Sequence, residues 1–70
     1  MSGQNIAFNV EGMSCEHCVN AIKAALTKLN GVYDVIVDLN SKRVAVEYDE
    51  ERVSADILRE TIEDAGYKVR

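Results

Sequence analysis

The 70-residue chain has no proline and no tryptophan, and it contains only two cysteines and one histidine. Two cysteines form at most one intramolecular disulfide, too few for a disulfide-stapled secreted fold. No apolar run approaches the roughly 18 residues of a transmembrane helix, so direct membrane insertion is not expected. Basic residues are also too few for a nucleic-acid partner, because eight Lys and Arg stand against twelve Asp and Glu, for a net charge of −4.

The composition that remains is typical of a small globular protein. Hydrophobic residues make up 47% and charged residues 29% of the chain. At 70 residues we expect one domain, spanning residues 1–70, without a deep catalytic cleft. The first five residues lack a basic segment followed by an apolar one, so no export signal is expected. The predicted location is therefore the reducing cytoplasm.

Hydrophobic periodicity predicts six elements with no repeat or linker between them. A period of two predicts strands over residues 6–11, 32–39 and 43–48. A helical period predicts one helix over residues 16–29 and a second after the N-cap Ser54. Gly31 and Gly66 follow the two helices, and Tyr67 and Val69 indicate a short fourth strand. Three sets of residues are predicted to share a face: Val19, Ile22, Ala25, Leu26 and Leu29; Tyr33, Val35, Val37 and Leu39; Ile57, Leu58, Thr61, Ile62 and Ala65.

Two connections carry their own signals. Asn40-Ser41 is typical of a hairpin turn between the second and third strands. The acidic stretch Asp49-Glu50-Glu51 predicts a solvated loop, because clustered carboxylates repel one another and resist burial. A calcium site is the weaker interpretation of the same stretch.

The order strand-helix-strand-strand-helix-strand predicts an α+β fold, a ferredoxin-like βαββαβ sandwich. Each helix reverses the chain, so the first two strands run parallel and leave room for the third between them. The result is a four-stranded antiparallel sheet with two helices on one face, which buries the inward residues in one core. This fold by itself implies no function, because many unrelated activities share it.

The sharpest local feature is the pair Cys15 and Cys18 at the predicted start of the first helix. The unpaired N–H groups of a helix start favour thiolate over thiol. Thiolates select Cu(I), zinc or an iron–sulfur cluster. A closed zinc site needs four protein ligands and a cluster usually needs four cysteines, whereas Cu(I) is satisfied by two sulfurs. The pair therefore predicts Cu(I), with Ag(I), Hg(II) or Zn(II) as substitutes.

The segment Gly12-Met13-Ser14-Cys15-Glu16-His17-Cys18 resembles the metal loop of heavy-metal-associated domains, whose signature is Gly-Met-x-Cys-x-x-Cys. The likeness extends over essentially the whole chain, and His17 and Tyr67 look like those of bacterial cytosolic copper chaperones. Only Val69-Arg70 departs, because it leaves a shorter fourth strand than usual. The resemblance implies that Cys15 and Cys18 hold Cu(I) and pass it by thiolate exchange to a copper-transporting P-type ATPase, or to its N-terminal domain.

Four neighbouring residues allow more than one interpretation. Met13 is better explained as an apolar filler than as a thioether ligand, and the resemblance implies that it anchors the loop in the core. Ser14 has no visible histidine–carboxylate relay and is not expected to be a nucleophile. His17 is an exposed helix residue, a modulator of the thiolates, or an extra ligand in a copper-bridged homodimer. Tyr67 either simply packs under the loop or also places its hydroxyl near the sulfurs, where it would shield the metal.

The expected function is a carrier and not an enzyme. One alternative is a metal-binding module excised from a copper-transporting ATPase. An alternative of another class is a dithiol–disulfide oxidoreductase, although thioredoxin-type domains are longer and use a cis-proline, which this chain lacks.

Overall fold

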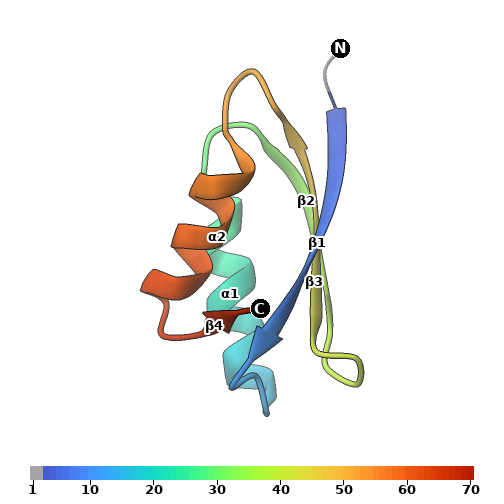
Figure 1. The fold of residues 1–70 in the computed structure, drawn as a ribbon, viewed down its shortest axis with the longest axis vertical. Coiled ribbons are helices and arrows are strands. Elements are labelled where there is room, and N and C mark those ends of the chain that lie inside the picture. Colours follow the sequence, from blue (N-terminus) through green and yellow to red (C-terminus); the bar gives the residue numbers. More distant parts are fainter. Residues whose placement is uncertain (1–2) are drawn as a thin grey trace.

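The computed structural model describes residues 3–70. Residues 1 and 2, which belong to the N-terminal segment in which no export signal is expected, lie outside the described residues. The elements follow the predicted order: β1 (Gly3–Glu11), α1 (Glu16–Thr27), β2 (Val32–Asp38), β3 (Arg43–Asp49), α2 (Ala55–Asp64) and β4 (Lys68–Val69). They form an antiparallel sheet of order β2-β3-β1-β4, with β3 between β1 and β2. Both helices cover one face of this sheet (Figure 1). The predicted ferredoxin-like α+β fold is confirmed.

The ends of several elements differ from the prediction. The strand β1 begins at Gly3 instead of residue 6, and α1 ends at Thr27 instead of residue 29. The reason at α1 is a tight turn, in which Leu29 N donates to Leu26 O at 3.1 Å. Gly31 then adopts a φ of +105°, a left-handed conformation that glycine accommodates without strain.

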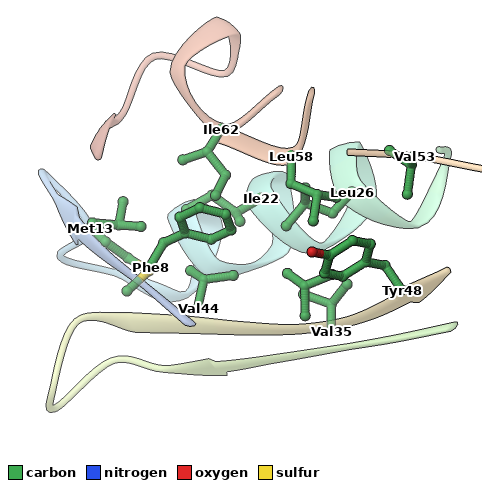
Figure 2. Packing of buried hydrophobic residues seen from close by; sticks show 12 residues of the cluster. Phe8, Met13, Ile22, Leu26, Val35, Val44, Tyr48, Val53, Leu58 and Ile62 are labelled. Carbon is green, nitrogen blue, oxygen red and sulfur yellow. The ribbon is translucent and has the colours of Figure 1, made fainter. Parts of the chain in front are cut away.

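The core lies between the helices and the sheet (Figure 2). Each helix contributes two fully buried residues, Ile22 and Leu26 from α1 and Leu58 and Ile62 from α2. The sheet contributes alternate residues of β1 and β3, as the period of two predicted. The buried hydrophobic residues are Phe8, Val10, Met13, Ile22, Leu26, Val35, Val44, Val46, Tyr48, Val53, Leu58 and Ile62.

The buried stripe of α2 is narrower than predicted. Ile57 is 43% exposed, Thr61 is half-buried and Ala65 is exposed. Ala65 is the C-cap of α2, where the chain turns away from the helix axis. Ser54 acts as the predicted N-cap, and its hydroxyl accepts a hydrogen bond from Ile57 N at 3.3 Å. No helix in the described range 3–70 has the length and apolar character needed to cross a membrane.

The prediction that Tyr33 shares the buried face of β2 is wrong. Val32 pairs with Tyr48 and Asp34 pairs with Glu47, so Tyr33 is an extra residue between two successive pairs. Such a bulge changes the direction of the side chains that follow. Tyr33 is 58% exposed as a result, and Val32 takes the inward position beside the core.

The acidic stretch is also different from the prediction at its first residue. Asp49 is the last residue of β3 and is only 9% exposed. Its carboxylate accepts from Glu51 N at 2.9 Å and from the Tyr33 hydroxyl at 3.4 Å, and Arg52 Nε lies 3.5 Å away. These partners compensate its burial. Glu50 and Glu51 are exposed as predicted, and within residues 3–70 no cluster of three or more potential metal ligands supports the calcium interpretation.

Candidate metal centre

The candidate metal centre is the loop between β1 and α1. Gly12 opens it with a φ of +87°, a conformation that side chains other than glycine rarely adopt. Met13 follows and is 1% exposed, beside Phe8 in the core (Figure 2). A buried thioether that packs on apolar neighbours anchors the loop, as predicted, and is not available at the surface. The residues after Met13 are therefore presented to solvent from a fixed base.

The two thiols lie together at the start of α1. Cys15 is the N-cap and is exposed, and Cys18 lies on the first turn and is half-buried. Cys18 N donates to Cys15 O at 3.1 Å, which closes the turn. The spacing of three residues puts both side chains on the same side of the helix. Their sulfur atoms are 3.3 Å apart.

The surroundings of Cys18 favour its charged form. The pKa of Cys18 is lowered from 9.0 to about 7, chiefly by a hydrogen bond with the Tyr67 side chain and next by the main chain of Ser14. The same contact with Cys18 raises the pKa of Tyr67, because the phenol is the better donor when it keeps its proton. Near neutral pH a large fraction of Cys18 is therefore thiolate, the form that binds soft metals.

Tyr67 reaches the loop from the far end of the chain. It follows Gly66 after α2 and is half-buried, and its ring is packed against the core. A Cβ placed on Gly12 would lie 3.8 Å from Tyr67 Cδ1, so the ring rests against the opening of the loop. Tyr67 thus packs on the core and its side chain is hydrogen-bonded with Cys18, whereas a role as a shield of the metal stays a prediction.

Replacing Tyr67 by Phe is expected to raise the pKa of Cys18 toward 9.0, because it removes the largest stabilising contact of the thiolate. The alkylation rate of Cys18 by iodoacetamide, followed by peptide mass spectrometry, should rise with pH through a midpoint of about 7 in the native protein. In Tyr67→Phe this midpoint moves to higher pH, and the rate at neutral pH falls. Tyr33→Phe, which removes the hydroxyl that donates to Asp49 and leaves the metal loop unchanged, is the control. An unchanged profile in Tyr67→Phe would contradict the assignment.

The remaining two predicted residues, Ser14 and His17, are next to the cysteines in the sequence. Ser14 and His17 are exposed, one in the loop and one on the first turn of α1. In the described part of the chain no group of three or more His, Cys, Asp or Glu side chains is placed so that it could hold a metal ion. The role of the Ser14 main chain was not predicted, because only the general presence of free N–H groups at a helix start is readable from sequence.

Comparison with known proteins gives one consistent result. The heavy-metal-associated domain matches residues 7–68. The copper chaperone CopZ of Staphylococcus haemolyticus is 56% identical over 66 residues, which cover 94% of this chain and 97% of that protein. Among solved structures, a CopZ metallochaperone has a TM-score of 0.94 at 40% identity, covering 96% of this chain and 100% of its own.

A third similar protein is the N-terminal domain of a potential copper-translocating P-type ATPase from Bacillus subtilis, solved in the Cu(I)-loaded state. Its TM-score is 0.92 at 34% identity, with 97% of this chain and 85% of that one covered. The family match spans almost the whole sequence, and the matched residues include the loop with both thiols. The chain belongs to the heavy-metal-associated domain family.

Proposed function

We propose that this protein is a cytoplasmic copper(I) chaperone, a carrier and not an enzyme, with Cys15 and Cys18 as the metal ligands. The observation that carries the proposal is the pair of sulfurs 3.3 Å apart at an exposed helix start. The similarity to proteins described as copper chaperones supports copper as the cargo. One domain over residues 1–70 suffices for this role, because binding needs only the loop and the scaffold that holds it.

The two-sulfur arrangement suits a soft monovalent ion. At metal–sulfur distances of about 2.3 Å, a linear site places the sulfurs about 4.6 Å apart, wider than they lie here. Cys15 can supply this movement, because it is exposed and its side chain makes no capping hydrogen bond. Cys18 is held by Tyr67 and by the loop main chain, so Cys15 is the ligand that adjusts. Ag(I) and Hg(II) share this softness and would be bound as non-native substitutes, and Zn(II) more weakly.

Delivery then proceeds by ligand exchange. A thiolate of the acceptor adds to the two-coordinate ion and forms a new copper–sulfur bond, which gives a three-coordinate bridge. The bond to Cys15 breaks next, that sulfur takes up a proton, and a second acceptor thiolate displaces Cys18. Copper stays Cu(I) throughout, so no oxidant or reductant is consumed. We propose a copper-transporting P-type ATPase, or its N-terminal domain, as the acceptor, which the similarity to such a domain supports.

A transfer experiment tests this function. Cu(I)-loaded protein is mixed anaerobically with an apo N-terminal domain of a copper-transporting ATPase, and the copper content of each is measured after rapid separation. We expect copper to redistribute between the two proteins even when a weak soluble Cu(I) chelator is present to bind any ion released to solution. Redistribution that stops when the chelator is present would contradict direct exchange, because copper would then pass through solution.

His17 is expected to tune this site without being required by it. Its exposed imidazole lies on the same first turn as Cys18. His17→Ala should change the Cu(I) affinity by less than about tenfold, in chelator competition, because both sulfurs remain. Asn20→Ala, also exposed on α1, is the matched control. Size analysis of the copper-loaded variants tests the copper-bridged homodimer, and complete loss of binding in His17→Ala would make the imidazole an obligatory ligand.

Two other functions use the same thiols. A module of a copper-transporting ATPase would share the whole site, and the boundaries of the gene distinguish it from a chaperone. A dithiol–disulfide oxidoreductase is favoured by one observation, a Cys18 pKa of about 7, which lies in the range of reactive Cys-x-x-Cys thiols. Catalytic turnover in an insulin reduction assay would support the oxidoreductase, whereas stoichiometric reaction would not.

A further inference from the structure

The short strand β4 has little main-chain pairing to hold it in place. It pairs with β1 at Val10 and Glu11, and Arg70 N donates to Asn9 O at 2.8 Å. Val69 is the one β4 residue packed partly against the core. Figure 1 shows β4 beside the end of β1 that leads into the metal loop. So short a ladder is marginal by itself, and side-chain contacts contribute much of what holds β4.

Glu11, the last residue of β1, meets two cations of the β4 segment. Its carboxylate lies 3.1 Å from Arg70 Nε. Lys68 is its direct cross-strand partner, and opposite charges in directly opposed residues attract each other. The Glu11 side chain is 45% exposed, so solvent screens its charge less than that of a fully exposed carboxylate. Electrostatic attraction therefore holds β4 at the end of β1.

The residue that β4 holds at the metal loop is Tyr67, which immediately precedes Lys68. Its ring is half-buried and packed against the core. Gly12 follows Glu11 in the same way, and a Cβ on Gly12 would lie 3.8 Å from Tyr67 Cδ1. One residue beyond the Glu11–Lys68 pair, the ring of Tyr67 therefore rests on the opening of the loop.

We propose that Glu11 is a positioning residue of the metal centre, which holds β4 so that the Tyr67 ring stays against Gly12. The inference rests on the proposed function for its effect on copper. The Tyr67 side chain is hydrogen-bonded with Cys18, so a ring that leaves the loop also uncovers this sulfur. When the attraction at Glu11 is removed, the uncovered arrangement is populated more often, and a competing ligand reaches the ion sooner.

Two substitutions of Glu11 should give graded effects. An ion pair between partly exposed side chains changes an equilibrium by up to about fivefold, which sets the scale for Glu11→Gln. Glu11→Lys adds repulsion from Lys68 and Arg70 to the loss of attraction, so its effect should be larger. Glu11 is not part of the hydrophobic core, and both variants are expected to keep the native circular dichroism spectrum.

The first test uses the reduced, metal-free protein and NMR. The Gly12 α protons lie beside the Tyr67 ring, so their chemical shifts report whether the ring is in place. We expect these shifts to move toward those of a glycine without a neighbouring ring in Glu11→Gln, and further in Glu11→Lys. The Arg70 amide, which donates to Asn9, should exchange with solvent faster, by up to about fivefold in Glu11→Gln and more in Glu11→Lys.

Glu47→Lys is the matched control. It makes the same change of charge on the same face of the sheet, at an exposed position of β3 whose partner in β1 is Asn5. Because Glu47 does not adjoin β4, the Gly12 shifts and the Arg70 exchange rate should stay native. Unchanged Gly12 shifts in Glu11→Lys, or equal changes in Glu47→Lys, would overturn the proposal.

The second test measures how fast the Cu(I)-loaded protein passes its ion to an excess of a soluble Cu(I) chelator. Glu11→Lys should accelerate this transfer at least about twofold. In a Tyr67→Ala background it should have no further effect, because the ring through which Glu11 acts is gone; Tyr67→Leu serves if Tyr67→Ala does not fold. Equal acceleration in both backgrounds would overturn the proposal. A native protein that binds no Cu(I) would refute the proposed function, and the metal-free spectra would still decide the role of Glu11.

Discussion

Replacing either Cys15 or Cys18 by serine is expected to abolish tight Cu(I) binding. A structural metal site with four ligands binds with about 10–16 kcal/mol, or about 2.5–4 kcal/mol for each ligand. Loss of one of only two sulfurs should therefore weaken binding by at least roughly 10²–10³-fold. Competition against a colorimetric Cu(I) chelator under anaerobic reduction measures this change, and the native protein should bind one ion per monomer at low loading.

The control for these variants is Asn20→Ser, which introduces the same side chain at an exposed position of α1. It should bind Cu(I) like the native protein. Both cysteine variants should keep the circular dichroism spectrum of the native fold, because Cys15 is exposed and Cys18 only half-buried. Full affinity in the two cysteine variants would show that copper binds elsewhere.

Leu58→Ala is expected to destabilise the apo protein by about 2–5 kcal/mol. Leu58 is 0% exposed in the centre of the core, so its truncation removes apolar contacts and leaves a cavity. A chain of 70 residues has a free energy of unfolding of about 4–10 kcal/mol at typical values per residue. The substitution therefore consumes a large share of the total stability. Urea unfolding of the reduced, metal-free protein measures it.

The neighbouring residue Ile57 provides the matched control. It lies on the same turn of α2 but is 43% exposed, so Ile57→Ala should cost clearly less than Leu58→Ala. Both measurements need a folded apo protein, which we expect because the core is built without the metal ligands at the surface. A random-coil spectrum without copper, or equal losses in the two variants, would contradict this account of the core.

Local patterns predicted most of the scaffold because they agree with the global fold. The alternation of Phe8 and Val10 and the helical spacing of Ile22 and Leu26 each indicate a buried face, and the structure packs these faces together. The errors occur where pairing overrides local alternation. Tyr33 turns outward because a bulge shifts the register between β2 and β3. No sequence pattern near Tyr33 predicts this bulge. Asp49 can be buried because the Tyr33 hydroxyl of β2 and Arg52 of the following loop reach its carboxylate.

The sequence by itself determined the pair of thiols. Cys15 and Cys18 are three residues apart at a helix start, and the local geometry of one helical turn places them together wherever that helix lies. Only the tertiary structure decided how those thiols are charged. The Tyr67 hydroxyl lowers the pKa of Cys18 because β4 returns the chain to the metal loop.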